Sequence, residues 1–424
     1  MAYEPGDIAF ILVSIALVWL MIPGIGYFYS GMAREKNALS LIMCCLISLV
    51  VVTVQWFIWG YSLTFSNNAS PFIGNLDHAF LRNVLDSPSI GSDKIPELLF
   101  CVYQGMFAAL TPALVFGSGA ERGRLLPMVF FIFIWTTIVY DTVACWTWNP
   151  QGWIAKLGVL DFAGGSPIHI TSGFSSLAYA LILGRRQTDE FKPHNMSNVI
   201  LGTAFIWFGW FGFNGGSALA GNLRAVMACL VTNLAASMGA ITWMCLDYRV
   251  HHKFSALGFC SGAVAGLVAI TPGAGFVSPG SALLIGCLGA VSCYAAVRLK
   301  NWLKYDDALD VFAVHGVGGV VGSILTGVFA ESYVAALDGS TVIAGGWINQ
   351  NWTQVPFQLI DVVAVSSWSF TITYAVLFLM NLVPGLSLRV DSEAEIQGLD
   401  MAEIGEAAYN KSEVGSQQKV NCEE

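Results

Sequence analysis

Long apolar stretches recur along the whole chain and limit what it can fold into. We count eleven, each about 17 to 28 residues long, and a helix needs roughly 20 residues to cross the hydrocarbon core of a bilayer. They lie at about 8 to 30, 39 to 63, 97 to 119, 125 to 147, 162 to 183, 197 to 220, 225 to 247, 254 to 271, 278 to 300, 309 to 330 and 355 to 382. The sequence therefore predicts an all-α integral membrane protein with eleven transmembrane helices.

The composition agrees with a membrane protein, since 55% of residues are hydrophobic and only 11% are charged. The first stretch has no basic segment before it and continues past Pro23, so we interpret it as a span and not as a cleaved signal peptide. The net charge of -9 resides largely in the C-terminal segment and is weak evidence about partners. We expect no nucleic-acid partner, no cofactor and no metal.

The basic residues predict the orientation of the chain in the membrane, because lysine and arginine accumulate in cytoplasmic loops. Alternate loops hold Arg34, Lys36, Arg122, Arg124, Arg185, Arg186, Lys192, Arg249, Lys253, Arg298, Lys300 and Lys304, whereas the other loops hold only Arg82, Lys94, Lys156 and Arg224. We therefore expect the N-terminus outside and the C-terminus inside. Residues 1–383 form the predicted transmembrane domain, and residues 384–424 form a cytoplasmic tail.

Two histidines enter apolar stretches after a carboxylate, in Asp161-Phe-Ala-Gly-Gly-Ser-Pro-Ile-His169 and Asp310-Val-Phe-Ala-Val-His315. Ionisable groups inside a membrane are costly and mark functional sites. If the first ten spans are two sets of five, the second set is inverted, as in many transporters. His169 would then lie roughly 12 Å below the outer end of its span and His315 roughly 7 Å above the inner end of its own. The sequence predicts that both approach the middle of the membrane.

Small residues recur every four positions in two stretches, as Gly258, Gly262 and Gly266 and as Gly319, Ser323 and Gly327. Small residues allow close contact between helices in lipid. We interpret both series as packing faces.

The histidines and a group of aromatic residues indicate what the site can do. Two neutral imidazoles can form a hydrogen-bonded polar strip in an apolar tunnel, and the rings of Phe107, Trp148, Trp210 and Phe213 offer faces that attract a cation. This set suits a small polar solute or a proton. A hydrolase with a histidine-bound metal is an alternative, but it needs a third ligand, and no His-x-x-x-His pattern or neighbouring glutamate accompanies either histidine.

Several long motifs closely resemble the ammonium transporter family (Amt/Mep/Rh). They are the Asp161 to His169 motif, Asp306-Asp-Ala-Leu-Asp-Val-Phe-Ala-Val-His-Gly-Val-Gly-Gly319, Gly209-Trp-Phe-Gly-Phe-Asn-Gly-Gly-Ser217 and Gly117-Ser-Gly-Ala-Glu-Arg122. The resemblance runs from Pro23 in the first stretch to Gly405 in the tail, and it is greatest to fungal Mep-type permeases that keep both pore histidines. It implies a homotrimer in the plasma membrane, with one conduction path in each subunit and no enzymatic activity.

The resemblance also implies roles for individual residues. Trp148, Phe107 and Ser217 would form an outer site that attracts ammonium, and Phe107 would stack with Phe213 as a gate. His169 and His315 would line the pore together with Trp210. Asp161 would orient the outer site, Asp310 would be its inverted counterpart, and Glu121 with Arg122 would form a structural pair at the inner face.

Desolvation of a bare ammonium ion costs several kcal/mol or more. We therefore expect the ion to lose its proton near the gate, ammonia to pass the histidines, and any net charge to follow a separate proton path; methylammonium would serve as an analogue. A sensor of the same fold, which reports ammonium through its tail to cytoplasmic regulators and conducts little, is the alternative.

Overall fold

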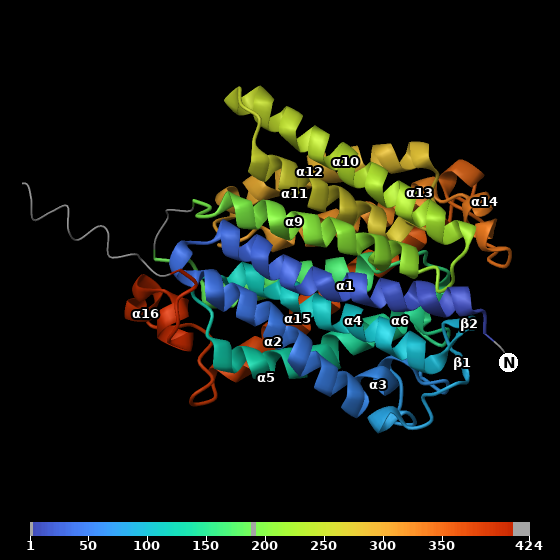
Figure 1. The fold of residues 1–424 in the computed structure, drawn as a ribbon, viewed down its shortest axis with the longest axis horizontal. Helices are drawn as coiled ribbons and strands as arrows, with labels where there is room; N and C mark the ends of the chain where they lie inside the picture. Colours follow the sequence, from blue (N-terminus) through green and yellow to red (C-terminus); the bar gives the residue numbers. More distant parts are fainter. Residues whose placement is uncertain (1–2, 188–191, 410–424) are drawn as a thin grey trace, which may run out of the picture.

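The computed structural model describes residues 3–187 and 192–409, which form a bundle of long, roughly aligned helices (Figure 1). Within these residues, ten helical segments are long and apolar enough to cross a membrane. The expected stretch at 162 to 183 is helical from Gly165 to Leu183 but is not among these ten segments. Its serines, its threonine and His169 make it less apolar than the others. The count of eleven spans stays a prediction.

Most helical segments are composites of several elements. The first part of the chain contains α1 (Pro5–Met32), α2 (Ala38–Gln55) with η2 (Trp56–Gly60) and α3 (Tyr61–Phe65), α4 (Glu97–Val115) with η4 (Phe116–Gly119), α5 (Leu125–Trp135) with η5 (Thr136–Tyr140) and α6 (Asp141–Trp148), and η6 (Gly165–Ile170) with α8 (Thr171–Leu183). The second part contains α9 (Met196–Trp210) with η7 (Phe211–Gly215), α10 (Leu223–His251), α11 (Ala256–Ile270) with η8 (Thr271–Gly273), α12 (Pro279–Leu303), η9 (Phe312–Val317) with α13 (Gly318–Phe329), and α15 (Gln354–Asn381). Short elements are η1 (Glu35–Asn37), η3 (Ala79–Leu81), α7 (Trp153–Leu157), α14 (Ser332–Ala335), η10 (Ala336–Asp338), η11 (Trp347–Asn349), α16 (Ser392–Gln397) and η12 (Asp400–Ile404).

A small antiparallel hairpin, β1 (Pro88–Ser89) and β2 (Ser92–Pro96), departs from the all-α prediction. It lies in the long loop before α4. The Ser89 hydroxyl donates to the Ser92 carbonyl at 2.7 Å and accepts from the Ser92 N–H at 3.0 Å. These bonds close the turn, so a two-stranded ribbon forms although no sheet is present to extend it.

Polar residues at the helix starts satisfy backbone donors that the helix itself leaves free. Asn195 caps α9, Asn222 caps α10 and Ser255 caps α11, each by accepting a hydrogen bond from the backbone N–H three residues later. These caps locate the starts of three neighbouring helices in the second part of the chain.

Small residues set the helix spacing in the second part of the chain, as the sequence predicted. A Cβ added at Gly262 would meet Gly239 and Trp243 of α10, and one added at Gly266 would meet Ala235. This packing face of α11 is therefore confirmed. Because side chains are absent there, the α10 and α11 backbones come close enough to exclude lipid.

The two ends of the bundle differ. The N-terminus, the β1–β2 hairpin and α14 lie at one end, and α16 lies at the opposite end (Figure 1). At the α16 end, Asp400 accepts hydrogen bonds from the backbone N–H groups of Leu39 and Ser40 at 3.0 and 2.8 Å, and Glu403 accepts one from Leu125 at 3.0 Å. The described part of the predicted tail is thus fastened to the ends of α2 and α5. Its remainder, 410–424, lies outside the described residues.

Candidate functional site

The structure brings the two predicted histidines into direct contact. Their Nδ1 atoms lie 3.1 Å apart, and the rings are near parallel at 27°, with centroids separated by 5.3 Å. One Nδ1 donates and the other accepts, since a neutral imidazole has one donor and one acceptor nitrogen. His169 is fully buried, and its Nε2 has no partner among the described residues. That atom is free to bond a small solute.

Both histidines lie on π-helical segments, His169 on η6 and His315 on η9. Such local widening of a helix is frequent at functional sites. A hydropathy profile does not reveal such widening, so the sequence did not predict the two π-helical segments.

Asp161 holds the start of η6. Its Oδ1 accepts from the Gly164 and Gly165 N–H groups at 2.8 Å each, and its Oδ2 accepts from Ser166 at 2.7 Å. The carboxylate thus satisfies three free backbone donors and fixes the direction in which the His169 helix starts.

The equivalent bond at η9 comes from Asp307 and not from Asp310. Asp307 Oδ2 accepts from the Phe312 N–H at 2.7 Å, whereas Asp310 forms an ion pair with Lys300 at 2.5 Å. Asp307 precedes His315 by eight residues, the spacing that separates Asp161 from His169. This spacing was the signal in the sequence that identifies the counterpart. Burial, and next the charge of Asp310, raise the pKa of Asp307 to about 6.

A close contact between two glycines brings the histidine segments together. A Cβ added at Gly173 of α8 would lie well inside 3.0 Å of the Gly316 backbone and at 3.0 Å from the carbonyl carbon of His315. Only glycine fits at this crossing, and the distance between the two imidazoles depends on it.

A series of aromatic rings continues from His169 toward the hairpin end. Trp210 stacks on His169 with centroids 5.5 Å apart, and Phe213 lies 6.0 Å from His169. Phe213 also contacts Phe107 at 4.7 Å, at an interplanar angle of 69°, and Phe107 contacts Trp148 at 6.1 Å. The Phe107–Phe213 contact is therefore edge-to-face and differs from the stacked gate that the resemblance implies.

Three cavities follow this line of residues. A pocket of about 130 Å³ at the hairpin end is lined by Phe107, Trp148 and Ser217, and a small cavity of about 30 Å³ is lined by both histidines and Trp210. A third, of about 500 Å³, extends from His315 to the α16 end. Phe107 and Phe213 lie between the first two cavities.

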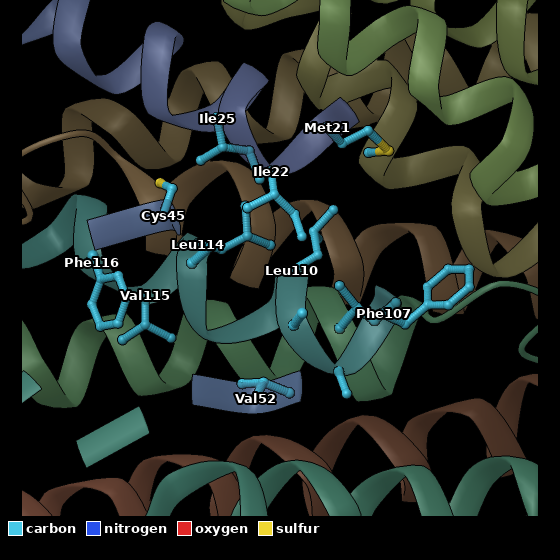
Figure 2. Packing of buried hydrophobic residues seen from close by; sticks show 14 of the residues in the cluster. Met21, Ile22, Ile25, Cys45, Val52, Phe107, Leu110, Leu114, Val115 and Phe116 are labelled. Atoms are coloured by element: carbon cyan, nitrogen blue, oxygen red, sulfur yellow. The ribbon is translucent and has the colours of Figure 1, made fainter. Parts of the chain in front are cut away.

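The small middle cavity is mostly apolar, and Tyr29 and Trp210 lie beside the two histidines in its lining. Leu110 and Leu114 of α4 and Met21 and Ile25 of α1 line it, and Figure 2 shows these residues within the packed hydrophobic cluster. A bare cation gains little from such walls, whereas a small neutral molecule loses little on entering.

The pocket at the hairpin end combines aromatic faces with a hydroxyl group. Ser217 donates to the Phe213 carbonyl at 2.8 Å, so its oxygen is free to accept a hydrogen bond. Tyr103, which the sequence analysis missed, donates to the Gly212 and Phe213 carbonyls at 2.9 Å and lies 3.4 Å from Ser217. Tyr103 precedes Phe107 by one turn of α4, and this spacing could have identified it as a residue of the pocket. Tyr103 fixes the η7 backbone that carries Ser217 and Phe213.

Glu121 and Arg122 do not pair with each other, contrary to expectation. Glu121 binds Arg34 at 2.9 Å and Arg186 at 3.2 Å, whereas Arg122 is fully buried and donates to backbone carbonyls. Arg186 also binds Asp306 at 2.9 Å. Burial opposes ionisation of Asp306, but the Arg186 hydrogen bond and nearby arginine charges lower its pKa to about 2. This network ties four loops together at the α16 end.

The described residues contain no group of three or more His, Cys, Asp or Glu side chains placed to hold a metal ion. The arrangement supports passage of a small solute through a narrow, mostly apolar route with hydrogen-bonding groups at a few points.

Comparison with known proteins gives consistent matches over nearly the whole chain. The model of the Ammonium Transporter Family matches residues 9–409. Ammonium transporter 1 of Schizosaccharomyces pombe is 56% identical over 96% of this chain and 83% of its own length, and ammonium transporter MEP2 of Saccharomyces cerevisiae is 49% identical over 97% and 84%. The crystal structure of Saccharomyces cerevisiae Mep2 is similar, with a TM-score of 0.90 and 48% identity over 97% of this chain and 93% of that one.

Proposed function

Because this chain belongs to the ammonium transporter family, as its motifs predicted, we propose that it carries ammonium across the membrane along the line of three cavities. The family consists of transporters and not enzymes, which sets the hydrolase alternative aside. The observation that carries the proposal is the contact between His169 and His315 inside a narrow apolar cavity that lies between two wider ones.

The hairpin-end pocket is the proposed recruitment site, so we refer to that end as the outer end. Ammonium would lie against Trp148 and Phe107 and donate a hydrogen bond to Ser217. A cation–π contact contributes about 1 kcal/mol or more once the ion is desolvated. The apolar middle cavity favours loss of the proton before passage, since a bare ion would have few oxygen atoms around it. Ammonia would then move along the histidine nitrogens, and any net charge would follow as a separate proton.

The membrane arrangement belongs to the same proposal. The chain would cross the plasma membrane eleven times, with Gly165–Leu183 as the fifth span in chain order in addition to the ten apolar segments, and with the N-terminus outside. Residues 384–424 would form a cytoplasmic regulatory tail. Three copies would assemble, each with its own path.

The test is uptake of ammonium and methylammonium, with simultaneous recording of current, by cells that lack their own transporters. We expect saturable uptake by the intact chain, and loss of uptake or of selectivity against potassium in His169→Ala and His315→Ala. Unchanged rate and selectivity in both variants would overturn the histidine pathway.

The alternative of an ammonium sensor has less support, because the relatives above are named as transporters. The contacts of Asp400 and Glu403 with the inner ends of α2 and α5 would suit coupling to a regulator. Variants that carry no ammonium but still signal its presence would favour this alternative.

A further inference from the structure

A buried arginine lies directly behind the outer pocket. Arg224, in the first turn of α10, is only 7% exposed. Its guanidinium carbon lies 4.8 Å from the ring centroids of both Phe162 and Phe276, and its Nε donates to the Gly275 carbonyl at 2.9 Å. The side chain therefore joins α10, the turn after η8 and the segment that follows Asp161.

Phe162 connects this arginine to the proposed substrate site. Phe162 lines the outer pocket together with Phe107, Trp148 and Ser217, whereas Arg224 does not. The Phe162 N–H donates to the Pro272 carbonyl at 2.9 Å. A Cβ added at Gly275 would collide with the Phe162 ring. The ring is thus held from three sides, and one of its contacts is a cation.

A positive charge at this point is unfavourable for two reasons. The start of a helix is the positive end of its dipole, which repels arginine. A cation in the outer pocket would also be separated from the guanidinium group by little more than the Phe162 ring, close enough for repulsion at low ionic strength.

Asp338 supplies the opposing charge. Its Oδ2 accepts from Arg224 Nη1 at 3.0 Å, and its Oδ1 accepts from the Ser340 and Thr341 N–H groups at 2.8 and 2.7 Å. Burial opposes ionisation, but the hydrogen bonds from Thr341 and Ser340 and the charge of Arg224 lower the pKa of Asp338 well below its usual range. The carboxylate therefore stays charged wherever transport is measured.

We propose that Arg224 and Asp338 form a positioning and charge-compensating pair for the outer site: Arg224 holds the Phe162 wall, and Asp338 cancels the arginine charge so that the pocket attracts monovalent cations of the ammonium type. The inference rests on the proposed function. Asp338 is accordingly a determinant of apparent affinity although it touches no substrate.

The experiment is a double-mutant cycle with Asp338→Asn, Arg224→Gln and both together, assayed by methylammonium uptake at equal amounts of protein in the membrane. Asp338→Asn leaves one uncompensated positive charge, so we expect the KM to rise about three- to tenfold at low ionic strength. The maximal rate should stay within about twofold, and added sodium chloride should reduce the effect on KM. The double variant should have a lower KM than Asp338→Asn, because both charges are gone, and its remaining excess over the parental KM measures the loss of the Arg224 contact with Phe162.

Comparison of Arg224→Gln with the double variant isolates the Asp338 charge even if Asp338→Asn alone does not fold. Both of these variants lack the arginine and differ only at position 338. We expect the KM of the double variant to exceed that of Arg224→Gln by about three- to tenfold. Asp77→Asn is the matched control, because Asp77 is an exposed carboxylate that does not line the pocket; its KM should equal that of the parent.

An unchanged KM on loss of Asp338 in either background, or an effect that salt does not reduce, would overturn the proposal and leave Asp338 with a structural role only. If the parent protein itself takes up no methylammonium, the proposed function fails instead.

Discussion

Replacement of Gly173 by alanine perturbs the contact that sets the distance between the histidines. The added Cβ would lie well inside 3.0 Å of the Gly316 backbone, where neither partner is a flexible side chain. The two segments must separate by about 1 Å to relieve the overlap, and such overpacking costs about 1–3 kcal/mol.

The same movement stretches the 3.1 Å bond between the two Nδ1 atoms past the range of a hydrogen bond. We expect a lower melting temperature in detergent and an uptake rate per transporter at least about threefold lower, because the lost bond contributes about 0.5–1.5 kcal/mol. Both are measured on purified and reconstituted protein.

Gly280→Ala is the control for the general effect of alanine in a helix, because a Cβ added at Gly280 meets nothing within 4 Å. Its uptake and melting temperature should match those of the parent. If Gly173→Ala matches Gly280→Ala in both assays, the glycine contact does not control the histidine pair and the reasoning is refuted.

Three further predictions concern single side chains. Asp161→Ala leaves three backbone N–H groups of η6 without an acceptor, so the free energy of unfolding should fall by about 3 kcal/mol or more, measured by thermal melting; an unchanged melting temperature would contradict the capping role. Trp148→Leu removes an aromatic face from the outer pocket and should raise the KM for methylammonium about five- to tenfold, whereas an unchanged KM would argue against cation–π recruitment. Because the pKa of Asp307 is raised to about 6, the folded state binds more protons than the unfolded state between about pH 4 and pH 6. The contribution of Asp307 to stability should thus be lost as pH rises through this window. The melting temperature of the parent should fall relative to that of Asp307→Asn over that pH range. If the melting temperatures of the two proteins change with pH in parallel, the pKa of Asp307 is not raised.

Ten of the eleven stretches expected from the sequence coincide with helical segments long and apolar enough to cross a membrane, because length and hydropathy are read directly from the residues. Sequence analysis did not locate the β1–β2 hairpin, which depends on a serine side chain closing a turn. It also assigned the inverted counterpart of Asp161 to Asp310, although the eight-residue spacing from His315 favours Asp307; the fold shows that Asp307 reaches the start of η9 and that Asp310 pairs with Lys300.

The sequence by itself determined that this chain is a helical membrane protein of the ammonium transporter family, with two histidines in apolar segments. Only the tertiary structure decided that these histidines touch, that Phe107 meets Phe213 edge-to-face, and that Arg224 and Asp338 lie behind the outer pocket. The physical reason is that a membrane helix is apolar on nearly every face, so its hydropathy carries no information about its rotation. Rotation is set by where backbones meet without side chains between them, as Gly173 meets Gly316.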